Sequence, residues 1–148
     1  MAEDLAPICP YCNTTSELVY GTLLYPHNPA LAHLPFYYCG PACDAWVGCH
    51  KDTEIPLGRL ANAELRHWKV QAHVAFDKLW RVSTISKRKE LRRRAYLLLA
   101  EQMGLPPSEC HIGKMDVTLC KLVIEIVDSR VIHHQLRKAH KANANANT

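Results

Sequence analysis

The chain has 148 residues, of which 48% are hydrophobic and 22% charged, and its formal net charge is +4. This composition excludes a largely disordered chain, and the length allows one domain or a small metal module joined to a helical one. No apolar run reaches the length of a membrane span, and "MAEDLAP" lacks the apolar core of a secretory signal. We therefore expect a cytoplasmic protein whose seven cysteines are metal ligands or catalysts rather than disulfides.

The first motif, "ICPYCN" at residues 8–13, fits two kinds of site. In glutaredoxins Cys-Pro-Tyr-Cys is a redox motif that lies between a strand and a helix N-terminus. Too few residues precede Cys9 for such a strand, and "NTTSELVYGTLLY" after Cys12 predicts a turn and then a strand. A metal site is therefore the favoured interpretation.

A second cysteine pair lies in "YYCGPACDAW". Two pairs joined by a β-hairpin predict a zinc ribbon, in which four thiolates surround the ion; here they are Cys9, Cys12, Cys39 and Cys43. The Pro-rich segment "YPHNPALAHLP" forms a long hairpin tip, and lengthening a loop costs only about 0.6 kcal/mol per doubling.

Local turn chemistry supports this ribbon. Asn13 is suited to a positive φ in the first knuckle, and Gly40 and Pro41 are suited to the turn of the second. Cys49 and His50 follow closely and are alternative ligands to Cys43.

Three amphipathic helices are predicted after residue 56. The first lies within residues 60–80 with Asn62 as N-cap, and His73 lies at the edge of its apolar stripe. The second covers residues 86–103, from Ser86 to a stop at Gly104. The third follows Asp116 as N-cap and turns Val123, Ile124 and Val127 inward. The fold class is α+β, with a zinc ribbon at residues 1–55, a three-helix unit at 56–130, and a basic, low-complexity tail at 131–148 without regular structure.

The first half of the second helix carries the strongest charge cluster in the sequence. Six cations stand against one acid, Glu90; they are Lys87, Arg88, Lys89, Arg92, Arg93 and Arg94. Positive charge near a helix N-terminus opposes the helix dipole, so the cluster does not serve helix stability. A solvated face is one explanation, and binding to phosphates or to an acidic protein surface is the other.

Several blocks together resemble a family of zinc-finger-containing proteins found in bacteriophages and prophages. The blocks are "CPYC", "CDAWVGCHK", "PLGRLANAELR", "AHVAFDKLW" and "ECHIGKMD", and the resemblance covers roughly residues 7–127. It implies zinc on the two cysteine pairs, a phage source and hence the host cytoplasm, but no established activity. The family usually has Cys-x-x-Cys where this chain has Cys-Gly-Pro-Ala-Cys, so the ligand that accompanies Cys39 stays open.

Five more cysteines and histidines lie in these blocks: Cys49, His50, His73, Cys110 and His111. They are candidates for a second metal site or a Cys–His nucleophile pair, or they hydrogen-bond within loops. The sequence has no HExxH motif and no phosphate-binding Gly-rich loop.

The sequence therefore favours a non-enzymatic, zinc-binding accessory protein that contacts nucleic acid through its basic helix. Tyr37, Tyr38 and Trp46 would then stack on bases or pack in the core. The alternative is an inhibitor or adaptor that binds a host or defence-system protein. An enzyme built on His50, His73 and His111 is the third possibility.

Overall fold

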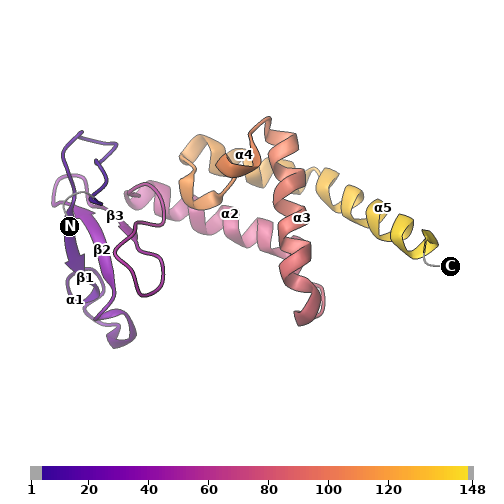
Figure 1. The fold of residues 1–148 in the computed structure, drawn as a ribbon. Helices are drawn as coiled ribbons and strands as arrows, with labels where there is room; N and C mark the ends of the chain where they lie inside the picture. The colour runs from indigo at the N-terminus through magenta and orange to yellow at the C-terminus, as the bar shows by residue number, and fades with distance from the viewer. Residues whose placement is uncertain (1–4, 147–148) are drawn as a thin grey trace. The chain divides into compact units, whose positions relative to one another are not determined.

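The computed structural model describes residues 5–146, with side chains described for residues 5–138. The chain divides into two compact units, Met1–Arg66 and His67–Thr148, and we call them the N-terminal and C-terminal units. The division falls inside helix α2, Ala63–Arg81 (Figure 1). No helix of the described residues is both long and apolar enough to cross a membrane.

The N-terminal unit is built on a three-stranded antiparallel sheet in the order β1-β2-β3. Its strands are β1 (Glu17–Tyr20), β2 (Pro35–Cys39) and β3 (Ala45–Gly48). Tyr38 lies opposite Glu17 on one side and opposite Trp46 on the other. The expected hairpin corresponds to β1 and β2, and β3 adds a strand that the sequence did not predict.

A small core lies beneath this sheet. Tyr37, Ala45 and Leu60 are fully buried in it together with Cys9. The buried Tyr37 hydroxyl donates a hydrogen bond to the Glu54 carbonyl oxygen at 2.6 Å. The chain after β3 returns to the sheet through isolated bridges, so that residues 56–61 belong to this unit. So few large side chains give the unit little hydrophobic stabilisation of its own.

A short helical connection joins β1 to β2. It contains α1 (Gly21–Leu24) and the 3₁₀ turn η2 (Pro29–Leu31). A Cβ at Gly21 would lie 1.8 Å from the Leu31 carbonyl oxygen, so only glycine fits there. The Pro-rich tip predicted for the hairpin is therefore an ordered turn.

The C-terminal unit is helical. Besides residues 67–81 of α2 it contains α3 (Ile85–Met103), η3 (Pro107–Glu109), η4 (Ile112–Lys114), α4 (Val117–Asp128) and α5 (Val131–Ala146). Contacts join α3 to α4, α5 and η3 (Figure 1). Fully buried residues of this unit include Phe76, Leu99, Ile112, Val123 and Ile132.

The predicted helix ends are largely confirmed. Asn62 and Asp116 act as N-caps, since their Oδ1 atoms accept hydrogen bonds from the Leu65 and Leu119 N–H groups, both at 2.9 Å. Gly104 ends α3 with φ 68°. The Ser86 cap is wrong, because α3 begins at Ile85 after Thr84. Of the third helix's predicted core residues, Val123 and Val127 are buried and Ile124 is half-buried.

The predicted three-helix unit has a further helix, because α5 forms where a tail without regular structure was expected. Ile132 is fully buried and Leu136 half-buried one turn later, which anchors the helix through its apolar face. Alanine-rich sequence beyond them favours continuation to Ala146. The last two tail residues, 147–148, lie outside the described residues.

Candidate metal centre

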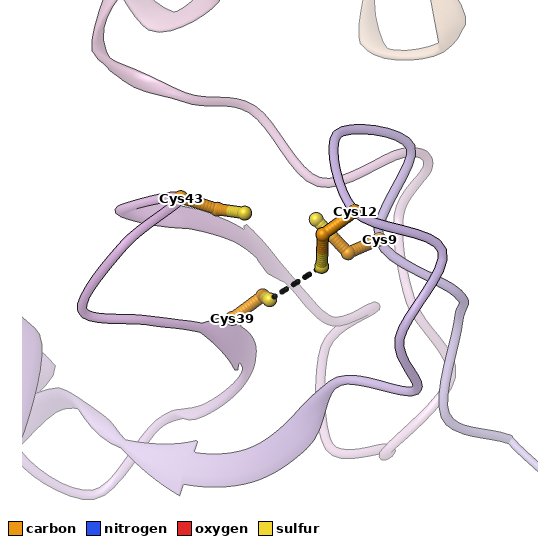
Figure 2. A group of neighbouring side chains, drawn as sticks. All are labelled: Cys9, Cys12, Cys39 and Cys43. Atoms are coloured by element: carbon orange, nitrogen blue, oxygen red, sulfur yellow. Dashed lines mark hydrogen bonds between the residues drawn. The ribbon is translucent and has the colours of Figure 1, made fainter.

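Four cysteine side chains converge in the N-terminal unit. The Sγ atoms of Cys9, Cys12, Cys39 and Cys43 all lie within 4.8 Å of one another (Figure 2). Cys12 Sγ and Cys39 Sγ are 3.5 Å apart. In a tetrahedral site with metal–sulfur bonds of about 2.3 Å the sulfurs are about 3.8 Å apart. The four cysteines are therefore arranged to bind a metal ion.

The first knuckle is a tight turn before β1. An isolated bridge between Ile8 and Thr15 closes it. Within it the Cys9 N–H donates to the Thr14 carbonyl, and the Asn13 N–H donates to the Cys9 carbonyl, both at 2.9 Å. Asn13 has φ 61°, which confirms the left-handed residue expected after Cys12.

The second knuckle is the loop from β2 to β3. Cys39 ends β2 opposite Ala45, and Cys43 lies in the loop. The left-handed residue here is Asp44, φ 48°, which follows Cys43 as Asn13 follows Cys12. Gly40 instead makes room for the Tyr38 hydroxyl, which would lie 2.0 Å from a Cβ at that position. Asp shares with Asn the tolerance of positive φ, a signal for the second knuckle that the sequence did contain.

The open question of the fourth ligand has a geometric answer, since Cys43 belongs to the sulfur cluster. Cys49 is half-buried beyond β3 and bridges to Pro56, and burial raises the pKa of its thiol. His50 is exposed, and its carbonyl oxygen accepts a hydrogen bond from the Thr53 hydroxyl at 2.8 Å.

Protonation in the cluster is uneven. Hydrogen bonds from the Thr14 side chain and backbone lower the pKa of Cys12 to about 6. The hydrogen bond with Cys12, together with burial, raises the pKa of Cys39 to about 12. A divalent cation favours the thiolate form of each ligand, so binding releases protons.

The start of α2 is tied to both knuckles. The Tyr11 hydroxyl accepts a hydrogen bond from the Asn62 N–H at 3.2 Å. Arg66 Nη1 donates to the carbonyl oxygens of Asp44 at 2.9 Å and of Ala61 at 2.6 Å. No local sequence pattern predicts this role of Arg66, because its partner Asp44 on the second knuckle is distant along the chain.

Of the three ribbon aromatics expected either to stack on bases or to pack in the core, Tyr37 lies in the core, whereas Tyr38 and Trp46 are half-buried and pack against neighbouring side chains. Tyr37 is fully buried. Trp46 is half-buried, with Arg66 3.5 Å above its ring and Tyr25 accepting a hydrogen bond from Nε1 at 2.9 Å. Tyr38 packs against Trp46 with ring centroids 6.2 Å apart. These rings stabilise the unit.

The other candidate ligands do not join the sulfur cluster. Cys49 and His50 belong to the N-terminal unit, whereas His73, Cys110 and His111 belong to the C-terminal unit. Across residues 5–138, no second group of three or more Cys, His, Asp or Glu ligand atoms gathers. The second metal site and the Cys–His pair stay predictions.

The three candidates in the C-terminal unit have different environments. His73 is half-buried, and burial lowers its pKa. Cys110 is buried, which raises the pKa of its thiol to about 11, so little nucleophilic thiolate forms near neutral pH. His111 is exposed, and its ring packs 5.5 Å from that of Tyr96.

The basic cluster lies on the first half of α3. Arg93 pairs with Glu90 at 2.6 Å, and Arg88 Nε donates to the Ser83 carbonyl at 3.2 Å. Lys87 and Lys89 are exposed. Glu90 is the one carboxylate among these six cations, so this half of the helix has a strong excess of positive charge.

A groove runs along each side of this half-helix. The α5-side groove, about 510 Å³, is lined by Lys87, Leu91 and Arg94 of α3 and by Leu136 and Arg137 of α5. The η3-side groove, about 550 Å³, is lined by Lys89, Arg92, Arg93 and Tyr96 of α3 and by Pro107 and His111. Ser86 and Glu90 border both grooves, and we call this line of α3 the ridge.

Comparison with protein families gives a match to the zinc-finger-containing domain over residues 6–130. This range includes all four converging cysteines. No curated protein and no solved structure matches the chain.

Proposed function

We propose that this chain, which belongs to the family of zinc-finger-containing domains, holds Zn²⁺ as a structural ion and binds nucleic acid through the first half of α3. The observation that carries the first part is the convergence of four Sγ atoms within 4.8 Å. Thiolate ligands in a tetrahedral arrangement suit zinc. Four protein ligands complete its coordination and leave no position for a reacting water, so the ion is structural.

The small core explains why the N-terminal unit would need an ion. The zinc would join the loop before β1 to the loop after β2, beside a core whose fully buried large side chains are Tyr37 and Leu60. In small zinc domains the binding free energy is largely the folding free energy. Metal analysis of the purified chain tests this part: one zinc per chain is expected, and a fully folded chain without metal contradicts it.

The charge of α3 supports the nucleic-acid part. The first half of α3 carries six cations and one carboxylate, Glu90, which already pairs with Arg93. Such an excess of cations is suited to bind the phosphates of a nucleic acid, because this binding releases the counterions condensed on the nucleic acid. The affinity for nucleic acid should therefore fall steeply as salt rises.

A charge-reversal experiment tests this part of the proposal. Replacing Arg92, Arg93 and Arg94 by Glu should abolish binding of labelled DNA and RNA in a fluorescence anisotropy titration. Lys51→Glu, an exposed cation of the N-terminal unit, is the control and should retain binding. If the triple variant binds as the parent does, α3 is not the nucleic-acid surface.

One observation favours a second candidate function. The α5-side groove has Leu91 and Leu136 beside its cations, a combination suited to an acidic protein segment with apolar side chains. A phage-encoded inhibitor or adaptor would bind a host protein in this way. Affinity purification from nuclease-treated host lysate separates the two functions, because a protein partner survives the treatment and a nucleic-acid bridge does not.

A further inference from the structure

On the premise of the proposed nucleic-acid function, we infer that the first half of α3 enters the major groove of duplex DNA. The observation that carries this inference is the position of the ridge between two grooves, each lined by cations. A duplex presents one phosphate strand on either side of its major groove. An α-helix with its side chains is about 10–12 Å across, and the major groove is about 12 Å wide.

Cations lie on both flanks of the ridge. Lys87 and Arg94 line the α5-side groove, where α5 adds Arg137. Lys89 and Arg92 line the η3-side groove. With the ridge in the major groove, these two sets of side chains face opposite strands. A single strand would engage only one set.

Two apolar side chains at the N-terminal end of α3 are exposed to solvent and not buried in the core. The turn between α2 and α3 has three residues, 82–84. Val82 and Ile85 at this turn are 83% and 82% exposed. In helix-turn-helix proteins the N-terminal residues of the second helix contact base edges. Val82 and Ile85 are suited to the C5-methyl groups of thymine, which line the major groove.

The aromatic ring of the η3-side groove argues against single-stranded nucleic acid. Tyr96 is half-buried, its ring centroid lies 4.2 Å from that of Phe76, and Arg92 lies 5.0 Å above it. Single-strand binders stack bases on free aromatic faces, whereas the Tyr96 ring already packs against Phe76, Arg92 and His111. Duplex RNA is also disfavoured, because side chains do not reach into its deep, narrow major groove.

Glu90 on the ridge is the one acidic side chain in the first half of α3, and it carries the same sign of charge as phosphate. Its carboxylate is held by Arg93 through two hydrogen bonds, at 2.6 Å and 3.1 Å. Glu90→Gln removes a negative charge that faces the DNA and frees Arg93. The variant should therefore bind duplex DNA more tightly than the parent chain.

The test compares four labelled probes with the zinc-loaded full chain by fluorescence anisotropy. They are a DNA duplex of about two helical turns, the same duplex with a bulky C5 substituent on its thymines, one of its single strands, and the RNA duplex. The C5 substituents fill the major groove and leave the phosphates unchanged. The unmodified duplex should bind about tenfold or more tightly than each of the other three.

The outcomes separate this inference from the function on which it rests. Equal affinity for the C5-substituted duplex or for the single strand would overturn the inference, while nucleic-acid binding would stand. If none of the four probes binds, both fall.

Two flank variants test the two-strand geometry. Lys87→Glu with Arg94→Glu reverses the two α3 cations of the α5-side groove, and Lys89→Glu with Arg92→Glu reverses two cations of the η3-side groove. Each should weaken duplex binding to a similar degree and reduce the salt slope by about 2, since each lost phosphate contact reduces it by about 1.

The control for these variants is Lys51→Glu with Lys121→Glu, which reverses two exposed cations elsewhere and changes net charge equally. It should keep the parent's salt slope. Far-UV circular dichroism identifies folded variants, and single substitutions replace any pair that does not fold. A loss confined to one flank would overturn the two-strand geometry.

Discussion

Replacing Cys43 by Ser should weaken zinc binding strongly, whereas the same change at Cys49 should not. The two cysteines are both half-buried and lie near each other in sequence, but only Cys43 Sγ belongs to the cluster within 4.8 Å. This pair of variants therefore distinguishes the two candidates for the fourth ligand with the same chemical change.

The expected magnitude follows from the number of sulfurs. Structural zinc sites contribute about 10–16 kcal/mol, and shared over four thiolates this is about 2.5–4 kcal/mol each. Cys43→Ser should thus lower zinc affinity by a factor of about 10² to 10³, and Cys49→Ser by less than about threefold.

Competition with a chromophoric chelator measures both affinities at one pH. Substitution with Co²⁺ gives an independent readout, because its thiolate charge-transfer band depends on the number of sulfur ligands. Cys43→Ser should weaken this band and Cys49→Ser should leave it unchanged. Loss of affinity in Cys49→Ser with retention in Cys43→Ser would refute the assignment.

Three further predictions concern stability and protonation. Arg66→Ala should destabilise the zinc-loaded N-terminal unit by about 2 kcal/mol, because two carbonyl hydrogen bonds and a cation–π contact are lost, whereas Asp44→Asn should cost under about 1 kcal/mol in the same urea titration. Gly104→Ala should lower the stability of the C-terminal unit by about 1 kcal/mol in thermal unfolding, since φ is 68° there; an unchanged melting temperature would contradict the αL end of α3. Zinc binding at pH 7 should release at least two protons, because Cys39 and Cys43 have raised pKa values without the ion; affinity should therefore rise with pH, and calorimetry in buffers of different ionisation enthalpy counts the protons.

The parts of the fold that sequence predicted are those set by local rules. The cysteine spacing and the left-handed preference of Asn13 identified the first knuckle, and helical periodicity with the caps Asn62 and Asp116 identified α2 and α4. Each of these signals lies within a few residues of the feature that it determines.

The parts that sequence missed depend on contacts between distant segments. Strand β3 is short and ends in Gly48, and it forms because β2 offers it a partner. Helix α5 was hidden by its low-complexity composition, although Ile132 anchors it in the core. The two grooves beside α3 arise from the packing of α5 and η3, which no local pattern in α3 specifies.

The central claim is that a zinc ion bound by four cysteines holds the N-terminal unit together. Amide hydrogen exchange on the zinc-loaded and the fully chelated chain, resolved by residue, tests it most directly. We predict that chelation removes protection from the amides of β1, β2 and β3, while those of α3 and α4 keep theirs. Strand amides that remain protected in the metal-free chain would contradict the claim.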